Sequence, residues 1–486
     1  MELIILLIIV GGAYLLGRSS KGKLPQQYQP KLGNTTYQPP QSQFRRNDRL
    51  INQKRAELKD VALSDEQQQL FEKLENTSTN VFVTGKAGTG KSLLLQYFRA
   101  YTTKKVVVVA PTGVAALNVS GQTMHSLFRL PLFVITKDKQ GDLRLDSKTA
   151  YLLRNLDTVV IDEISMVRVD TLEAIDCLLK RARSSDLPFG GVQMVMFGDL
   201  YQLPPVVSSR ELQKYFADTY GGVYCFNAHS WKAASPEIIE LSNIFRQKDS
   251  QFIDLLNTVR NGSVDDTLLI ELNKRATVEI PSSGTITLAT TNRSVRDIND
   301  RRLNELPGDA HEFQAEITGQ LEESAFPTEE VLRLKVGAQI MMLRNDREKR
   351  WVNGTLGTIK SISGDEIKVD IDGHVYTVSP ETWSKISYYY NREEQKVEEE
   401  VVSTFRQFPL RLAWAITIHK SQGQTYSSVV IDLGDGAFAH GQTYVALSRC
   451  TQLETLYLKR DVYREDVIVD SSVLAFMETK LRTENG

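Results

Sequence analysis

The sequence contains few of the residues that form covalent or metal cross-links. It has 3 cysteines in 486 residues, and Cys177, Cys225 and Cys450 are too far apart to form a C-x-x-C pair. This spacing excludes a cysteine zinc site and is typical of a reducing compartment. The 6 histidines are equally scattered, so we predict no structural metal.

An excess of charge of one sign is also missing. The chain has 58 Lys and Arg against 60 Asp and Glu. No global electrostatic field can therefore attract an anionic partner, and any contact with nucleic acid must come from a local groove. The length is sufficient for two or three domains with cores of their own.

The apolar run at the N-terminus, Leu3 to Leu16, is short for a membrane span, which usually takes about 20 residues. Basic residues follow the run, whereas a cleaved signal peptide has them before it. This order favours an uncleaved anchor over residues 1–17, with the rest of the chain cytoplasmic, at the inner face of the membrane. The alternative, an apolar tail that does not span, is open. Residues 18–60 are rich in Pro, Gln, Asn and Ser, which predicts a flexible basic linker.

A glycine-rich motif follows an apolar, β-branched run that begins at Val81. Its glycines allow the loop to turn backbone N–H groups inward around phosphates, and the next helix adds its positive dipole end. We expect Lys91 to reach the β- and γ-phosphates and Ser92 to hold Mg²⁺. The motif predicts an ATP site formed by Gly85, Ala87, Gly88, Thr89, Gly90, Lys91 and Ser92.

Three further apolar runs, 106–110, 156–161 and 193–197, read as buried parallel strands that end in polar residues. Runs 285–290 and 429–432 repeat this pattern without a phosphate loop. Strands that alternate with helices in this way predict an α/β fold, with doubly wound sheets and the ligand along their carboxyl edge.

Residues from about 331 to 409 have a different pattern. Short alternating runs are separated by the turn signals Asn353-Gly354, Gly364-Asp365 and Asp372-Gly373, which predict an inserted small β-barrel. The charge run Glu393–Glu400 is typical of a solvated hairpin or loop. Two interpretations of Tyr388-Tyr-Tyr are open: stacking on bases, or packing in the core of the barrel.

Several polar residues fit the chemistry of ATP hydrolysis. Asp162 would orient the Mg²⁺ and Glu163 would polarise the attacking water. Gln202 follows the next strand, where it would sense the γ-phosphate. Arg246 and Arg449 are candidate arginine fingers, each worth roughly 10³–10⁵ in rate. As isolated features, the acidic pair also fits a turn or helix cap, and each arginine a surface ion pair.

Gln67 has two competing interpretations. Ser64 with Gln67 three residues later forms a capping box, which needs no ligand. A glutamine just ahead of a phosphate loop can instead pair with the adenine edge.

The motifs together resemble the Pif family of superfamily-one DNA helicases, which shares features with the RecD and Dda relatives. They are Gly-Lys-Ala-Gly-Thr-Gly-Lys-Ser, Ala-Pro-Thr-Gly-Val-Ala-Ala-Leu-Asn, Val-Ile-Asp-Glu-Ile-Ser-Met-Val, Gly-Asp-Leu-Tyr-Gln-Leu-Pro-Pro-Val, Ile-Phe-Arg-Gln, Ala-Ile-Thr-Ile-His-Lys-Ser-Gln-Gly-Gln-Thr and Tyr-Val-Ala-Leu-Ser-Arg. They run in family order from Leu63 to about Leu456. Tyr426, Ser427 and His440 depart from the common pattern, and the apolar N-terminus has no counterpart in it.

The resemblance implies two RecA-like cores with ATP between them and single-stranded DNA across their top. The first would span 61–240, with a wedge-type insertion at about 128–153, and the second 241–486, with the barrel inserted. The resemblance also implies that Gln67 contacts the adenine and that Gly423 contacts the nucleotide. It implies the same roles in ATP binding and hydrolysis that are given above for the other residues. The implied DNA contacts are Thr112, Gly113, His125, Thr290, Asn292, Thr417, His419 and Ser421.

We therefore expect an ATP-dependent helicase, a monomeric motor that moves 5′ to 3′ on single-stranded DNA and opens forked duplexes. The same resemblance implies roles in DNA repair, DNA recombination and telomere maintenance. The rival hypothesis is a membrane-tethered, nucleotide-dependent switch or scaffold that binds DNA without unwinding it.

Overall fold

The computed structural model describes residues 54–484, except 57, 132, 208, 248, 282, 347, 349 and 365. The predicted anchor, 1–17, and most of the predicted linker, 18–60, fall outside the described residues. Within the described part of the chain, no helix combines the length and the apolar character that a membrane crossing requires.

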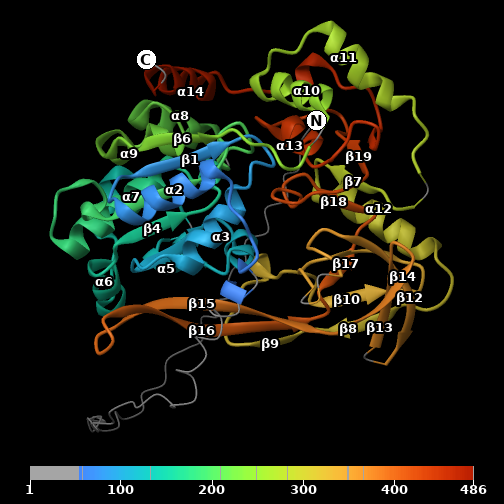
Figure 1. The fold of residues 1–486 in the computed structure, drawn as a ribbon, viewed down its shortest axis with the longest axis horizontal. Coiled ribbons are helices and arrows are strands. Elements are labelled where there is room, and N and C mark those ends of the chain that lie inside the picture. The colour runs from blue at the N-terminus through green and yellow to red at the C-terminus, as the bar shows by residue number, and fades with distance from the viewer. Residues whose placement is uncertain are drawn as a thin grey trace, which may run out of the picture. The chain divides into compact units, whose positions relative to one another are not determined.

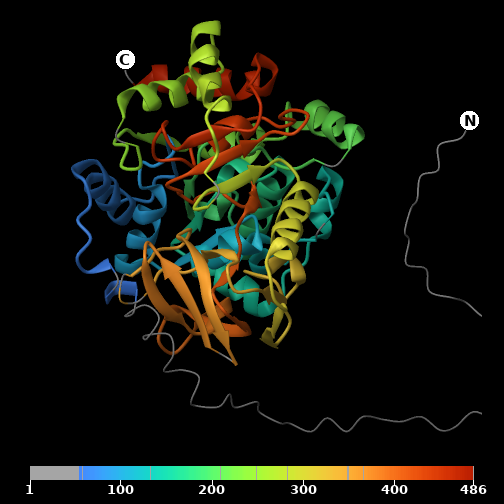
Figure 2. The ribbon, with the colours of Figure 1, turned by 90° about the vertical axis from the view of Figure 1, so that its right-hand side faces the viewer.

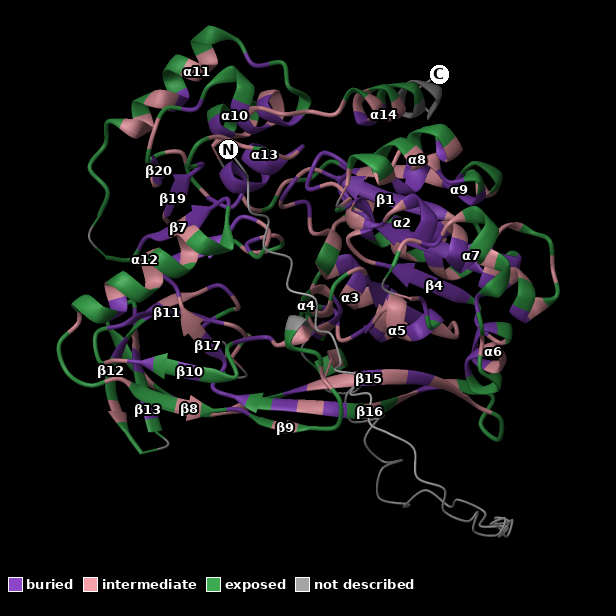
Figure 3. Cartoon of the chain, turned by 180° about the vertical axis from the view of Figure 1, so that it is seen from behind, coloured by how far each residue is buried: buried purple, intermediate pink, exposed green. Residues whose placement is uncertain are grey.

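A six-stranded parallel sheet occupies the first half of the chain, in the order β3-β2-β4-β5-β1-β6 (Figure 1). Its strands β1, β4 and β5 are buried along their whole length, as expected for a parallel sheet covered by helices on both faces. Figure 3 shows this buried sheet among helices whose outer faces are exposed. The strands are β1 (Val81–Gly85), β2 (Val106–Ala110), β3 (Gln122–Thr123), β4 (Thr158–Ile161), β5 (Gln193–Phe197) and β6 (Glu237–Leu241).

The first of the helices in this half precedes β1, and the others connect successive strands of the sheet. They are α2 (Asp65–Asn76), α3 (Lys91–Tyr101), α4 (Gly113–Asn118), α5 (Met124–Phe128), α6 (Ser147–Arg154), α7 (Val169–Arg183), α8 (Arg210–Tyr220) and α9 (His229–Ala234). The predicted wedge insertion contains the 3-10 helix Lys137–Asp142 and most of α6. Its role as a wedge stays a prediction.

The predicted linker ends earlier than residue 60. Residues 54–56 are helical and Leu58 is buried. The Arg55 Nε donates a hydrogen bond to Ala100 O at 2.7 Å, and the Tyr101 hydroxyl donates to Arg55 O at 3.2 Å. These contacts tie the segment to α3, so the folded part begins by Lys54.

A second, four-stranded parallel sheet lies in the other half, in the order β18-β7-β19-β20. Figure 2 shows it in red and yellow beside α12. Its strands are β7 (Ile286–Ala289), β18 (Ala415–Thr417), β19 (Val429–Asp432) and β20 (Leu456–Leu458). The helices are α10 (Ser250–Asn261), α11 (Asp266–Asn273), α12 (Asn292–Glu305), α13 (Gln442–Leu447) and α14 (Ser471–Glu484). The predicted α/β class with parallel sheets is confirmed.

The region predicted as a barrel contains a five-stranded antiparallel sheet, β14-β13-β12-β11-β17. Within the described residues its edge strands, β14 and β17, are not paired with each other, so barrel closure is not seen. The Asp372-Gly373 turn is confirmed: both residues have positive φ, and Ile371 pairs with His374 around them. The strands are β11 (Gln339–Met342), β12 (Leu356–Ser363), β13 (Glu366–Ile371), β14 (His374–Val378) and β17 (Leu410–Leu412). A two-stranded sheet, β8 (His311–Gln314) with β10 (Val331–Leu334), accompanies them.

A long hairpin, β15 (Glu381–Asn391) and β16 (Lys396–Gln407), extends from this region to the first sheet (Figure 1). The base of the hairpin pairs with β9 (Glu316–Thr318). Farther along, the Tyr388 hydroxyl accepts a hydrogen bond from Val108 N (3.3 Å), and Tyr388 N donates to Gln122 Oε1 (3.4 Å). The hairpin therefore covers the edge of the sheet at β2, where β3 is too short to pair.

Two predictions about the hairpin need correction. Tyr388 is buried, so it packs as a core residue, but against the first sheet and not inside a barrel. The run Glu393–Glu400 does form the turn and start of β16, but it is not fully solvated: Glu399 is largely buried in an ion pair with Arg99.

Candidate active site

The glycine-rich loop after β1 has the conformation that its sequence predicts. Gly85, Gly88 and Gly90 have φ of 148°, 87° and 80°. A Cβ on Gly88 would stand 2.4 Å from the Cβ of Arg246, so no larger residue fits there. The loop thus combines left-handed backbone with close approach by the segment after β6.

Lys91, the first residue of α3, folds back over this loop. Its Nζ donates hydrogen bonds to Gly85 O (2.6 Å) and Lys86 O (3.0 Å). Burial lowers the Lys91 pKa to about 8, against the opposing attraction of Asp199. The ammonium is hydrogen-bonded to neutral carbonyl oxygens and has lost part of its hydration. A phosphate group at the loop would therefore stabilise its charge.

Asp162 and Glu163 follow β4 at the carboxyl edge of the sheet. Burial and the charge of Glu163 raise the Asp162 pKa to about 8, and burial also raises the Glu163 pKa. Glu163 has a left-handed backbone, with φ of 51°, which is uncommon for a residue with a side chain. Two adjacent carboxyls that disfavour their own charges are suited to a divalent cation.

Gln422 links this acidic pair to the sensor candidate from the other half of the chain. Its Nε2 donates to Glu163 Oε2 (3.1 Å) and to Gln202 Oε1 (3.2 Å). Gln202 follows β5 and is buried. Sequence reasoning missed Gln422, although it lies one residue before Gly423 in the Lys-Ser-Gln-Gly-Gln motif and could have been found there.

Both candidate arginine fingers lie near this site, and in the part of the chain that the structure describes neither has an acidic ion-pair partner. Arg246 donates from Nη1 to Ser448 O at 3.1 Å, and burial together with the nearby Arg449 charge lowers its pKa to about 9. Arg449 is 1% exposed and donates to four neutral oxygens, those of Val445, Ser421, Gln424 and the Ser448 side chain. No ion pair involves either guanidinium among the described residues, so a surface ion pair does not explain them.

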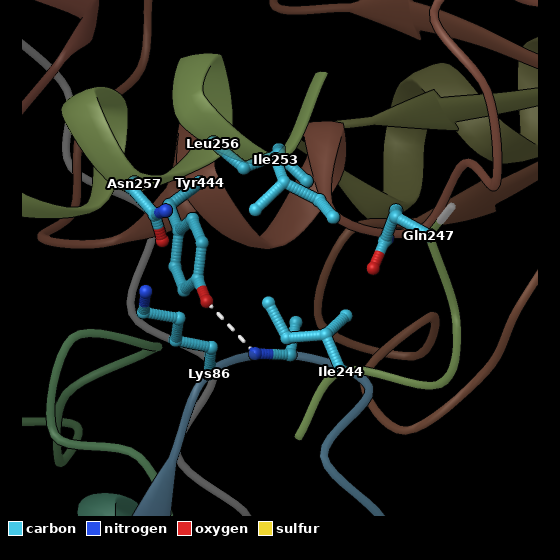
Figure 4. A pocket seen from close by; sticks show the side chains of 8 residues that line it. Lys86, Ile244, Gln247, Ile253, Leu256, Asn257 and Tyr444 are labelled. Atoms are coloured by element: carbon cyan, nitrogen blue, oxygen red, sulfur yellow. Dashed lines mark hydrogen bonds between the residues drawn. The ribbon is translucent and has the colours of Figure 1, made fainter. Parts of the chain in front are cut away.

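Tyr444 of α13 and Asp199 were also missed. The Tyr444 hydroxyl accepts a hydrogen bond from Ala87 N at 3.0 Å, drawn as the dashed line in Figure 4. It donates to Asp199 Oδ2 at 3.4 Å, and Asp199 forms a buried ion pair with Arg260 at 3.1 Å. A tyrosine in a helical apolar pattern gives no sign of such a contact, because the contact joins two distant parts of the chain.

Gln67 fulfils the capping-box interpretation and also contacts the loop. Its Oε1 accepts from Ser64 N (3.1 Å), and the Ser64 hydroxyl accepts from Gln67 N (3.3 Å). The remaining amide nitrogen donates to Thr89 O at 3.4 Å. The cap is therefore confirmed, and the adenine contact stays a prediction.

The predicted DNA contacts of the first half differ in exposure, and one of them lies against a segment from the second half. Thr112 is exposed and its hydroxyl caps α4. A Cβ on Gly113 would stand 2.7 Å from the Cβ of Ala325, so the segment around Ala325 covers Gly113. His125 is half-buried, and burial lowers its pKa.

The predicted DNA contacts of the second half differ widely in exposure. Asn292 is exposed and His419 is half-buried, whereas Thr290 and Thr417 are buried. Ser421 is fully buried, and its hydroxyl donates to the carbonyl of residue 418 at 2.7 Å. In the described structure Ser421 therefore stabilises its own loop, and that hydroxyl is not presented to a ligand.

Comparisons with known proteins agree with the motif pattern. Residues 62–268 match the family described as PIF1-like helicase, and residues 316–362 match the DNA helicase Pif1 2B domain. The ATP-dependent DNA helicase Pif1 of Bdellovibrio bacteriovorus is 34% identical over 425 residues, 86% of this chain and 92% of that protein. The chain belongs to the Pif1 helicase family.

Other Pif1 proteins are similar as well. The human ATP-dependent DNA helicase PIF1 is 34% identical over 83% of this chain, which spans only 62% of the human protein's length. The crystal structure of Bacteroides sp. Pif1 with ADP-AlF4 is 36% identical, with a TM-score of 0.82 over 88% of this chain and 99% of that one. The crystal structure of Bacteroides Pif1 bound to ssDNA is 38% identical, with a TM-score of 0.62 over 86% of this chain and 97% of that one.

Two departures from the Pif1 pattern are buried packing residues. The Tyr426 hydroxyl is directed at the sulfur of Met341, at 3.5 Å. His440 accepts a hydrogen bond from Asp470 N at Nδ1 (2.9 Å), and its Nε2 lies 2.8 Å from Leu200 O, which requires Nε2 to carry the proton. Neither departure removes a group from the site.

The residues present fit ATP with Mg²⁺. The loop glycines have the positive φ that turns backbone N–H groups toward a phosphate, and the acidic pair has raised pKa values. Lys91 and Arg246 are half-buried and Arg449 is buried, and within the described residues none of these cations forms an ion pair with an acidic side chain. The exposed Ser92 lies next to Lys91 at the start of α3. Anionic phosphates and a divalent cation are the complements of these two sets of charges.

Proposed function

We propose that this Pif1-family chain is an ATP-dependent DNA helicase that moves 5′ to 3′ on single-stranded DNA, with ATP and Mg²⁺ as its cofactors. The observation that carries the proposal is the Gln422 contact to Glu163 and Gln202. It joins a loop of the second half to the acidic pair and sensor of the first, so the site contains groups from both sheets. A site divided in this way couples closure of the two halves to the state of the nucleotide.

The roles of the residues follow from their positions. Lys91 and the loop amides bind the phosphates, while Ser92 and Asp162 hold the Mg²⁺, which supplies charge neutralisation at the phosphates when bound. Glu163 accepts a proton from the attacking water, and Gln202 contacts the γ-phosphate. Gln67 and Gly423 complete the nucleotide contacts.

Arg246 and Arg449 stabilise transition-state charge in this proposal. Each guanidinium is at least partly removed from water and donates only to neutral oxygens. Negative charge that develops nearby in the transition state would therefore interact strongly with it. Because Arg449 bonds to the carbonyls of Ser421 and Gln424, it would have to leave them when the two halves close on ATP.

The DNA path in this proposal crosses the tops of two RecA-like cores, 61–240 and 241–486. Relatives crystallised with ssDNA, or described at forked dsDNA, support these partners. The exposed or half-buried candidates Thr112, His125, Asn292 and His419 suit backbone contacts without sequence reading. The 2B match at 316–362 falls partly in the inserted sheet, which we place in the second core.

A forked-duplex assay tests the proposal. We expect ATP-dependent strand separation of a fork with a 5′ single-stranded tail, and none with a 3′ tail alone. Glu163→Gln is the matched control, because it keeps the fold and removes the water-activating carboxylate. Separation from the 3′ tail would contradict the polarity. ATP hydrolysis stimulated by DNA without separation of either substrate would favour a DNA-binding switch.

A further inference from the structure

Gln247, the residue after Arg246, makes a pair of contacts that the proposed roles do not explain. It is 2% exposed, and its Nε2 donates to Ser448 O (3.2 Å) and Cys450 O (3.0 Å). These two carbonyls belong to the residues immediately before and after Arg449. One carboxamide thus holds the backbone on both sides of a candidate finger.

Arg246 joins the same arrangement. Its Nη1 donates to Ser448 O at 3.1 Å, so neighbouring side chains of one segment bind the same carbonyl. Ser448 is the last residue before Arg449 and caps α13. The segment after β6 therefore fixes the end of the helix that carries the other finger.

The far side of the Gln247 amide faces the phosphate loop. Its Oε1 has no hydrogen-bond partner among the described residues, and it lies 3.3 Å from where a Cβ on Gly88 would stand. Figure 4 shows Gln247 among the side chains that line the pocket next to Lys86 and Tyr444. Gln247 thus lies between the phosphate loop and Arg449.

The chemistry of the position favours a neutral double donor. Two backbone carbonyls need two N–H groups, which a carboxamide nitrogen supplies. A lysine or arginine would also donate, but it would add a third buried cation beside Arg246 and Arg449. Burial, and after it the repulsion from Arg449, already lower the Arg246 pKa. A methionine or glutamate of similar size would donate nothing.

We infer that Gln247 is a positioning residue that sets the placement of Arg449 for ATP hydrolysis. This inference rests on the proposed function, in which Arg449 stabilises the transition state. Gln247 touches no reacting atom and acts through the two carbonyls. Loss of its donors lets the Ser448–Cys450 backbone shift, and a displacement of about 1 Å can cost about 100-fold in rate.

The test compares Gln247→Met with the wild-type full chain in ATP hydrolysis stimulated by single-stranded DNA. We expect kcat to fall about 10-fold or more with KM for ATP little changed, because the lost contact acts on the transition state. ADP affinity should be kept, while affinity for ADP with aluminium fluoride, a transition-state analogue, should fall by the same factor as kcat. Gln247→Glu, which also lacks the donors, should behave alike if the methionine variant does not fold.

Gln339→Met is the matched control. Gln339 is also buried, and its Nε2 also donates to two backbone carbonyls, those of Thr285 (2.7 Å) and Ala413 (2.8 Å), beside the second sheet. This variant should lose stability to heat as Gln247→Met does, but keep kcat. A pure packing role for Gln247 would make the two variants alike in kcat, and would overturn the inference.

A double mutant separates action through Arg449 from an independent effect. In an Arg449→Ala background, Gln247→Met should lower kcat no further, because the group it positions is gone. An undiminished loss in that background would overturn the inference. If the wild-type chain hydrolyses no ATP, the proposed function fails. If the wild-type chain hydrolyses ATP and Gln247→Met has the same kcat, only the inference about Gln247 fails.

Discussion

Lys91 holds its ammonium against backbone carbonyls of the phosphate loop, whereas Glu163 holds its carboxylate against the Gln422 amide. In the proposed mechanism Lys91 binds the phosphates and Glu163 activates the attacking water, so the two substitutions should affect different steps. Lys91→Ala should lose both ATP binding and hydrolysis, because the phosphates lose their main fixed cation. Glu163→Gln should keep ATP affinity and lower kcat by about 100-fold or more.

Equilibrium binding of a fluorescent ATP analogue and single-turnover hydrolysis together check these variants. Glu66→Gln is a suitable control, since Glu66 is a half-buried acid without a proposed role at the phosphates, and its side chain accepts hydrogen bonds from Ser242 and Asn243. If Glu163→Gln hydrolysed ATP at the wild-type rate, another group would have to activate the water.

Asp162 predicts an unusual dependence of stability on pH. Its pKa is about 8 in the folded chain against an ordinary 3.8, so between these values the folded state binds more protons than the unfolded state. This group's contribution to stability is therefore present at low pH and lost as pH rises from about 4 to about 8. Asp162→Asn removes the effect, so its melting temperature relative to wild type should increase with pH in Mg²⁺-free buffer.

Asp199→Asn provides the opposite case. The Arg260 charge holds the Asp199 pKa below its usual value, so its contribution is present above pH 4 and lost only in acid. This variant should melt below wild type throughout pH 5 to 9. Thermal unfolding of both variants across that range measures the contrast, and parallel curves for Asp162→Asn and wild type would exclude the raised pKa.

At the scale of single residues, sequence motifs located the groups that act locally and missed those that act across the chain. The acidic pair follows the end of β4 directly, and Lys91 begins the helix after the phosphate loop, so a local pattern places each of them. Gln422, Gln247 and Tyr444 reach the site from segments far away in sequence, so no local pattern gives their contacts. Ser421 is a motif residue whose hydroxyl bonds inside its own loop, and its predicted contact with DNA stays a prediction.

Among the larger elements, the hairpin β15–β16 forms two ion pairs with helices of the first half, a largely buried one with α3 and an exposed one, Lys148–Glu400, with α6. Arg99 pairs with Glu399, and both side chains are largely buried. Glu399→Ala removes a hydrogen bond to a charged group, worth about 1.5 kcal/mol. We expect amide exchange of Val108, which donates to the Tyr388 hydroxyl, to become about 10-fold faster.

Hydrogen–deuterium exchange with mass spectrometry measures this effect on peptides from β2. Glu394→Ala is the control, because Glu394 forms its ion pair with Lys396 at the exposed turn of the same hairpin. Equal protection of β2 in both variants would mean that the ion pair does not hold the hairpin in place.

The elements themselves were predictable where their signals are local. Strands 193–197 and 429–432 appear with the predicted bounds, because each is a buried apolar run between turn residues. The Asp372-Gly373 turn also formed, since both residues tolerate positive φ. Barrel closure depends on pairing between β14 and β17, which are far apart in sequence, and the docking of Tyr388 depends on a sheet in another part of the chain.

Across the whole molecule, the near balance of charge limits how DNA can be bound. With 58 basic and 60 acidic residues, attraction has to come from a local groove. Affinity for single strands should therefore fall as salt is added and depend little on base sequence. Fluorescence anisotropy with oligonucleotides of different sequence, at 50 and 200 mM salt, checks both expectations. A flat salt response, or a strong preference for one sequence, would contradict backbone binding.

In the proposed mechanism, coupling between DNA and ATP would pass through one short segment of the second half. Residues 417–424 contain the proposed DNA contacts Thr417 and His419, and also Gln422, which bonds to Glu163. The Ser421 and Gln424 carbonyls of this segment accept hydrogen bonds from Arg449. DNA that shifts this segment would therefore act on both the proposed water-activating group and a proposed finger.

Gln422→Ala should consequently lower the ratio of DNA-stimulated to basal ATP hydrolysis by about 10-fold, in the range of common coupling energies. Because coupling is reciprocal in binding, a non-hydrolysable ATP analogue should also affect single-strand affinity less in this variant. Gln424→Ala is the matched control: it lies in the same segment, and its carbonyl bond to Arg449 is kept. Stimulation that survives in Gln422→Ala, or is lost equally in Gln424→Ala, would show that DNA reaches the ATP site by another route.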